Sequence, residues 1–206
     1  SLPAAPSGDT AVALAGVEVA RRAAKVAGQL ILDGMGATVE KTKLNFKDVV
    51  TEVDRNCQEV ISQTILEVFP EHRILGEEDV DPGAEEAAKA IGEAVAGSGW
   101  VWVLDPVDGT TNLANSIPLV TCSIALVKDG EVHAGVVFDP ARSEMFSAVR
   151  GVGAWLGDEP LPRGQDKAVP SLTLQEAVVC IGCPPEPTAF KRSVATLETL
   201  GPRVRG

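Results

Sequence analysis

The feature that most constrains this chain is the stretch from Trp100 to Thr111, which reads Trp-Val-Trp-Val-Leu-Asp-Pro-Val-Asp-Gly-Thr-Thr. Its first five residues are aromatic, β-branched or aliphatic, which is typical of a short strand buried on both faces. We expect the strand to stop at Asp105, because Pro106 fixes φ and favours a turn. Asp105 and Asp108 then both point into the space at the strand's carboxyl end, where their charges repel each other unless a cation separates them.

The same carboxylates have an ordinary explanation, since Asp-Pro and Asp-Gly are common turn formers. Gly109, Thr110 and Thr111 favour a functional role. They place small residues and free backbone amides where a helix can start, and a helix start binds phosphate through unpaired N–H groups. The stretch therefore predicts a metal and phosphate site, with a solvated turn as the alternative.

Composition narrows the class of protein. Of the 206 residues, 45% are hydrophobic and 23% charged, and no apolar run approaches the ~20 residues of a membrane span. The formal net charge of −11 argues against a nucleic-acid surface and favours a small anionic ligand held by metal ions or backbone amides. Four cysteines are too few for a disulfide-stapled secreted scaffold. We expect a soluble intracellular protein, of the cytoplasm or a plastid, that binds neither nucleic acid nor a membrane.

Apolar spacing predicts helices in the first part of the chain and strands after Trp100. The expected order begins with a leader (1–8) and a long amphipathic helix that is capped by Asp9 or Thr10 and ends at Gly34. A short strand or hairpin (38–50) and a helix from Thr51 to Pro70 are expected next. A strand (73–76) and an exposed helical connection (81–99) complete this part. An antiparallel meander is expected to follow, with strands over 120–127, 132–138 and 145–149, a piece near Trp155, a strand over 172–181 and a helix over 190–200.

Other polar residues have local explanations when taken singly. Glu77 and Glu78 follow a predicted strand and can belong to an acidic loop, Asp54 can be a helix-start carboxylate, and Lys43 can be an exposed lysine. The cysteines at 180 and 183 have no second pair to complete a zinc site, so we interpret them as structural. Neither His72 nor His133 has a sequence neighbour that would make it a base or a ligand, and the three tryptophans predict core or core-edge positions.

The order of these pieces resembles the inositol monophosphatase family of magnesium-dependent, lithium-sensitive phosphatases. The matching motifs are Lys43, Asp48-Val-Val-Thr-Glu-Val-Asp54, Gly76-Glu-Glu78, Trp102-Val-Leu-Asp-Pro-Val-Asp-Gly-Thr-Thr-Asn112, Gly135-Val-Val-Phe-Asp-Pro140, Glu144-Met-Phe146 and Arg150-Gly-Val-Gly-Ala154. The resemblance covers nearly everything from the first helix to the end of the chain.

The resemblance implies an α+β fold, a layered α/β sandwich whose mainly antiparallel sheet is flanked by two long N-terminal helices. Residues 9–206 would form this N-terminal domain as a single domain. The family's C-terminal α/β layer carries a Trp-Asp motif whose aspartate binds the second metal, and no Trp-Asp dipeptide occurs here. We therefore expect that layer to be absent from this chain, which leaves the activity of the chain by itself open.

The resemblance also implies that the protein binds two or three Mg²⁺ ions. Glu77, Asp105 and the carbonyl of Val107 would hold the activating ion, and Asp105 and Asp108 would bridge to a second. Such hard oxygen ligands suit magnesium.

Catalytic roles follow from the same resemblance. Thr110, aligned by Asp54, would position a water molecule that the metal and Glu77 activate. The amides of Gly109 and Thr110 would cradle the phosphoryl group. The positions just outside the ligands would be Lys43, Glu78 and Thr111.

Three functions are compatible with these observations. The first is a phosphomonoesterase acting on inositol monophosphate or a related small polyol or sugar phosphate, with histidinol phosphate, fructose bisphosphate or nucleotide bisphosphate as related substrates and a homodimer as one candidate assembly. The second, a haloacid-dehalogenase-type phosphatase, needs its two aspartates two positions apart, whereas Asp105 and Asp108 are three apart. The third is a catalytically incomplete structural or interaction subunit.

Overall fold

The computed structural model describes residues 8–35, 39–41, 49–77, 89, 92–94, 96–162, 173–182 and 186–205. The predicted site residues Lys43 and Glu78, and most of the predicted connection over 81–99, lie outside these ranges. The chain divides into two compact units, Ser1–Leu161 and Pro162–Gly206, and each is described by itself. Within the described ranges, no helix has both the length and the apolar character to cross a membrane.

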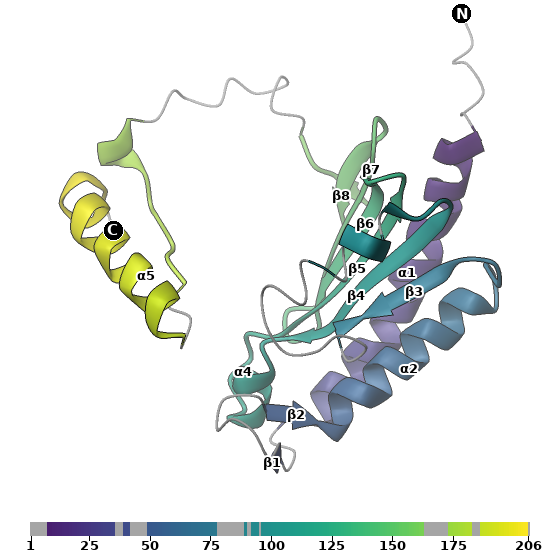
Figure 1. Ribbon diagram of the computed structural model, residues 1–206, viewed down its shortest axis with the longest axis horizontal. Coiled ribbons are helices and arrows are strands. Elements are labelled where there is room, and N and C mark those ends of the chain that lie inside the picture. The colour runs from purple at the N-terminus through teal and green to yellow at the C-terminus, as the bar shows by residue number, and fades with distance from the viewer. Residues whose placement is uncertain are drawn as a thin grey trace, which may run out of the picture. The chain divides into compact units, whose positions relative to one another are not determined.

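The first unit is built on a seven-stranded sheet in the order β3-β4-β5-β6-β7-β8-β9 (Figure 1). The β3–β4 pair is parallel, and every other neighbouring pair is antiparallel. The mainly antiparallel sheet and the predicted meander are thereby confirmed. The strands are β3 (Arg73–Gly76), β4 (Trp100–Asp108), β5 (Thr121–Lys128), β6 (Glu131–Asp139), β7 (Glu144–Val149), β8 (Gly153–Leu156) and β9 (Glu159–Pro160).

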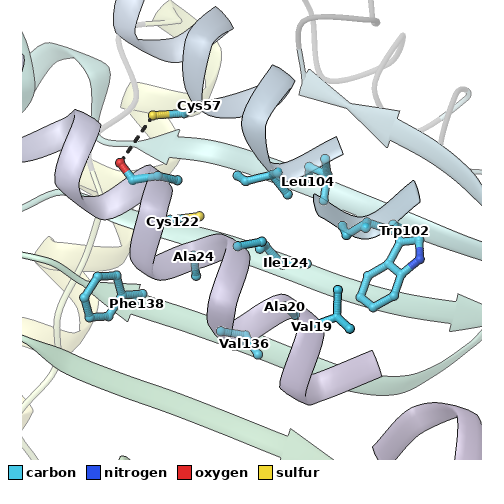
Figure 2. Close-up of a cluster of buried hydrophobic side chains, with 14 of the residues drawn as sticks. Val19, Ala20, Ala24, Cys57, Trp102, Leu104, Cys122, Ile124, Val136 and Phe138 are labelled. Carbon is cyan, nitrogen blue, oxygen red and sulfur yellow. Dashed lines mark hydrogen bonds between the residues drawn. The ribbon is translucent and has the colours of Figure 1, made fainter. Parts of the chain in front are cut away.

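Two long helices, α1 (Gly8–Asp33) and α2 (Glu52–Leu66), pack against one face of this sheet (Figure 1). The face of α1 that meets the sheet is rich in alanine and valine, so the helix axis can approach the strands closely. Figure 2 shows Val19, Ala20 and Ala24 of this helix facing side chains of the sheet. The buried sheet side chains among them include Trp102, Leu104, Cys122, Ile124, Val136 and Phe138.

The helix starts differ slightly from the sequence prediction. Helix α1 already begins at Gly8, so Asp9 lies in its first turn instead of capping it, and its carboxylate accepts a hydrogen bond of 2.6 Å from the ammonium of Lys128. The predicted hairpin is present, because β1 (Val39–Lys41) pairs antiparallel with β2 (Val49–Thr51). Thr51 is the last residue of β2, and α2 follows it directly.

The sequence predicted that strand β4 stops at Asp105, but the strand continues to Asp108. The register shifts on the way: Asp105 pairs with Ser123 and Asp108 with Thr121, so three steps on β4 oppose two on β5. One residue is therefore extra, as in a β-bulge. Pro106, which has no N–H to give to a ladder, lies inside the bulge, where proline is tolerated.

The second unit holds a 3-10 helix η2 (Leu174–Glu176), helix α5 (Pro187–Leu200) and a 3-10 helix η3 (Gly201–Arg203). The predicted last helix is confirmed and starts three residues early, with Pro187 in its first turn and Glu186 accepting from two backbone amides. The strand predicted over 172–181 is wrong for the part of it that the structure describes. Thr173 and Glu176 form a capping box there, which favours a helical turn over an extended strand.

Close packing between α1 and the sheet makes one glycine testable. A Cβ on Gly28 would lie 2.3 Å from Cε1 of Phe138, a ring that is only 8% exposed. We predict that Gly28→Ala lowers the free energy of unfolding by about 1–3 kcal/mol through overpacking, despite alanine's better helix propensity. Urea unfolding followed by circular dichroism measures the change. Gly8→Ala is the control, because no atom lies within 4 Å of a Cβ placed there, and equal stabilities of the two variants would contradict the prediction.

Candidate active site

The carboxyl end of β4 turns sharply into the short helix α4 (Thr110–Ala114) at Gly109. Gly109 has φ 104°, and a Cβ there would lie 2.8 Å from the carbonyl oxygen of Leu119, so both the dihedral and the space require glycine. The turn is fastened by Asn112, whose side-chain amide donates to that same carbonyl at 2.8 Å. The hydroxyl of Thr110 donates to the carbonyl of Val107 at 3.3 Å.

Glu77 reaches the same place from the neighbouring strand. Gly76, the last residue of β3, pairs with Leu104 in the parallel register. Glu77 follows Gly76 and Asp105 follows Leu104, so these two acidic residues are neighbours. Asp105 is half-buried, whereas the side chains of Glu77 and Asp108 are exposed. The structure thus gathers the three acidic residues that the sequence assigned to one metal site.

The electrostatics of this group are unfavourable without a cation. Burial raises the pKa of the Asp105 carboxyl to about 7, with the Glu77 and Asp108 carboxylates and a hydrogen bond to Glu77 acting in the same direction. The backbone amide of Val107 partly opposes this rise in pKa by donating a hydrogen bond to the carboxylate. The buried oxygen Oδ1 of Asp105 has no hydrogen-bond partner among the described residues.

These residues fit a hard divalent cation. Mg²⁺ prefers carboxylate and carbonyl oxygens, and Asp105 offers a buried oxygen beside two further carboxylates. The described part of the chain contains no three His, Cys, Asp or Glu side chains already grouped to hold a metal ion. Like charges with no cation between them repel, and the hydrogen bond between the Asp105 and Glu77 carboxyls accordingly requires a proton on one of the two.

Asp54 lies in the first turn of α2 and is 3% exposed. Strand β2, which leads into α2, packs against α4, so the start of α2 lies at the same end of the sheet as the acidic group (Figure 1). Burial raises the pKa of the Cys122 thiol, and so do the nearby groups Cys57, Asp105 and Asp54. Asp54 and Asp105 therefore both lie close to this thiol.

Two buried cysteines, Cys57 and Cys122, thus lie close to the acidic residues, although no role was predicted for them. The thiol of Cys57 donates to the carbonyl of Ala27 at 3.5 Å (Figure 2). Burial, and then the carboxylate of Asp54, raise its pKa to about 12. A thiol nucleophile must be deprotonated, so Cys57 and Cys122 are packing residues and not nucleophiles. No spacing pattern in the sequence marks either of them.

A pocket of about 300 Å³ opens beside Asp108 and Gly109. Its lining also includes Asp139 and Arg142, neither of which was predicted as a site residue. The Asp139 carboxylate accepts a hydrogen bond from the backbone amide of Arg142 at 3.0 Å and another from its guanidinium at 2.5 Å. The remaining lining residues are Asn112, Leu119, Val120 and Thr121.

Comparisons with known proteins agree with this geometry. The model of the inositol monophosphatase family matches residues 15–203. Inositol monophosphatase 3 of Solanum lycopersicum is 33% identical over 78% of this chain, and the Nus factor SuhB of Pasteurella multocida is 38% identical over 69%. The chain spans only 58% and 50% of the length of these two relatives.

A solved structure is also similar. The extragenic suppressor protein suhB from Bartonella henselae superposes with a TM-score of 0.75 at 27% identity, over 93% of this chain and 68% of that one. The fold of a solved relative, the family model and the curated relatives all point to the same family. The chain belongs to the inositol monophosphatase family.

Proposed function

We propose that this chain carries the metal- and phosphate-binding groups of a Mg²⁺-dependent phosphomonoesterase. The observation that carries the proposal is the half-buried Asp105, whose Oδ1 has no partner among the described residues and whose neighbours Glu77 and Asp108 add two negative charges. Such an arrangement costs stability unless a cation offsets the charge. Family membership supports phosphatase chemistry at this position.

The ligands would be carboxylates of Glu77, Asp105 and Asp108 together with the carbonyl of Val107. That carbonyl already accepts from Thr110, and its second lone pair remains for a cation. When bound, the two or three Mg²⁺ ions would offset charge on the phosphoryl group and lower the pKa of a water molecule toward neutrality.

The protein's own groups would orient the attack. The Thr110 hydroxyl, held near Val107, would position the attacking water, with Asp54 aligning Thr110 and Glu77 accepting the proton. The backbone amides of Gly109 and Thr110 would bind phosphoryl oxygens, with the left-handed conformation of Gly109 directing the chain away from the ligand. The roles of Lys43, Glu78 and Thr111 near this group stay predictions.

The substrate we propose is inositol monophosphate or a related small polyol or sugar phosphate. The pocket of about 300 Å³ beside Asp108 is at the lower end of the range for small-molecule sites. The relatives named inositol monophosphatase support this choice. Assembly as a homodimer and a single domain over 9–206 stay predictions.

Metal binding can be measured through stability. We predict that Asp105→Asn raises the free energy of unfolding of the metal-free chain at about pH 8, because one of three like charges is removed. Free Mg²⁺ at 100 times its Kd should stabilise the wild-type chain by about 2.7 kcal/mol and the variant hardly at all. Urea unfolding with EDTA or with Mg²⁺ gives both numbers.

Asp129→Asn is the matched control. Asp129 lies in the β5–β6 turn with φ 50°, a conformation that asparagine also tolerates. This variant should respond to Mg²⁺ as the wild type does. Equal Mg²⁺ stabilisation of the Asp105→Asn variant and the wild type would show that Asp105 is not a ligand.

The chemical step can be tested in the complete protein. We predict that hydrolysis of a substrate analogue with a chiral, isotopically labelled thiophosphoryl group inverts the configuration at phosphorus, because water attacks phosphorus directly in a single displacement. Analysis of the released chiral thiophosphate by phosphorus NMR measures the configuration. Retention of configuration would instead indicate two displacements through a covalent intermediate, such as an aspartyl phosphate at Asp105.

The role of Thr110 gives a separate prediction. Thr110→Ala should lower kcat by about 100-fold or more, as expected when a group that positions or deprotonates the nucleophile is lost, while Mg²⁺ still stabilises the variant. Thr64→Ala on α2 is the control, since Thr64 only donates to the carbonyl of Val60 on its own helix. A wild-type kcat for Thr110→Ala would remove Thr110 from the mechanism.

A further inference from the structure

A hydrogen bond between two aromatic side chains links strands β3 and β4 at the end remote from the acidic group. The indole N–H of Trp102 donates to Nδ1 of His72 at 3.0 Å. Trp102 is only 1% exposed, so its N–H depends on this acceptor within the protein. Nδ1 accepts a hydrogen bond only in the neutral imidazole, with the proton on Nε2.

The imidazole of His72 is fixed by its neighbours. It stacks on Phe69 with ring centroids 4.6 Å apart and an interplanar angle of 12°, and Trp100 lies 5.9 Å away at 23°. The backbone amide of His72 also donates to the carbonyl of Phe69 at 3.1 Å. The ring therefore has little freedom to offer Trp102 a different atom.

The His72–Trp102 hydrogen bond lies at the opposite end of strand β3 from Glu77. Strand β3 has four residues and, within the described part of the chain, pairs only with β4. His72 immediately precedes β3, and Glu77 immediately follows it. Glu77 and Asp105 repel each other when both are ionised, so the register of this short strand depends in part on what holds its near end.

We propose that His72 is a positioning residue, whose neutral imidazole fixes β3 in register with β4 and so keeps Glu77 beside Asp105, and that protonation of His72 releases this hold. A protonated ring would present a second donor to the indole N–H of Trp102. The consequence for Mg²⁺ binding rests on the function proposed above, whereas the consequence for stability does not.

The charged groups around His72 are of both signs. Glu71 and Arg73 flank it along the chain, and the guanidinium of Arg73 is directed to the carbonyl of Ala94 at 2.8 Å. Beyond Trp100, the ammonium of Lys128 lies 5.2 Å from the ring centroid, and His133 packs edge-on against the same ring at 5.0 Å.

Burial lowers the pKa of His72 below its ordinary value of 6.5. The unfolded chain therefore takes up a proton at a higher pH than the folded chain. Stability that is complete above about pH 6.5 is lost as the pH falls toward the folded-state pKa.

Three variants test the proposal in the whole chain. His72→Asn keeps an acceptor where Nδ1 lies but cannot be protonated, and His72→Leu removes the acceptor. His133→Asn is the matched control, because it removes the other of the chain's two histidines from the same aromatic group. The free energy of unfolding is measured by urea without metal from about pH 8 to about pH 5, with Mg²⁺ affinity measured by calorimetry at about pH 8.

We expect the wild type and His133→Asn to lose stability below about pH 6.5, and His72→Asn to lose less over the same interval. His72→Leu should bind Mg²⁺ about tenfold more weakly than the wild type, as is usual when a group that orients a metal ligand is removed, and His72→Asn should bind it nearly as the wild type does. The imidazole signal that disappears in His72→Asn should titrate below the ordinary histidine pKa of 6.5 in proton NMR.

The proposal would be overturned if His72→Asn and the wild type lost the same free energy of unfolding between about pH 8 and about pH 5. This measurement needs no metal and does not depend on whether His72→Leu folds. Wild-type Mg²⁺ affinity in His72→Leu, with none in Asp105→Asn, would also overturn it while leaving the proposed function intact. Equal Mg²⁺ affinity in Asp105→Asn and the wild type would overturn the proposed function instead, and the stability profiles would still decide the role of His72.

Discussion

The parallel pairing of β3 with β4 is the constraint on which the acidic group depends. Every other pair in the seven-stranded sheet is antiparallel and joins strands that follow one another in sequence. Only β3 reaches its neighbour across an intervening segment, and only parallel strands bring two carboxyl ends to one edge. Glu77 and Asp105 meet because of this pairing, and the bulge in β4 then places Asp108 at the same end.

Such a group needs a rigid base, because the charges themselves favour separation. The base is the layer between the sheet and helices α1 and α2, where small side chains permit close approach and Trp102 is buried against Gly16, whose added Cβ would lie 3.1 Å from its ring. The residue order along β4 determines where Asp105 lies. Trp102 and Leu104 anchor the strand in the core, and Asp105 comes directly after them, so its position is set by apolar packing and not by its own interactions.

The sequence was sufficient for most of the fold because its apolar spacing and turn residues agree with one another. The two helices, the hairpin and the meander all have such consistent local signals. Where tertiary contacts decide, prediction from sequence was less successful. Asp105 was expected to end a strand because Pro106 fixes φ and favours a turn, but a β-bulge accommodates Pro106 within the strand. Over 172–181 an apolar pattern suggested a strand, and the Thr173–Glu176 capping box produced a helical turn instead.

The site shows the same division between local and tertiary information. Motif spacing predicted that Glu77, Asp105 and Asp108 form one group, since the sequence pattern places each of them at the carboxyl end of an expected strand. His72, Cys57 and Cys122 had no such mark, because their importance comes from a partner distant in sequence: Trp102 for His72, and the carboxylates for the thiols. A histidine that accepts a hydrogen bond from a buried indole, and a carboxylate whose buried oxygen has no partner among the described residues, are both arrangements whose energy depends on a charge state. His72 and Glu77, the neighbour of Asp105, lie at opposite ends of the four-residue strand β3, so both arrangements act on the same short strand.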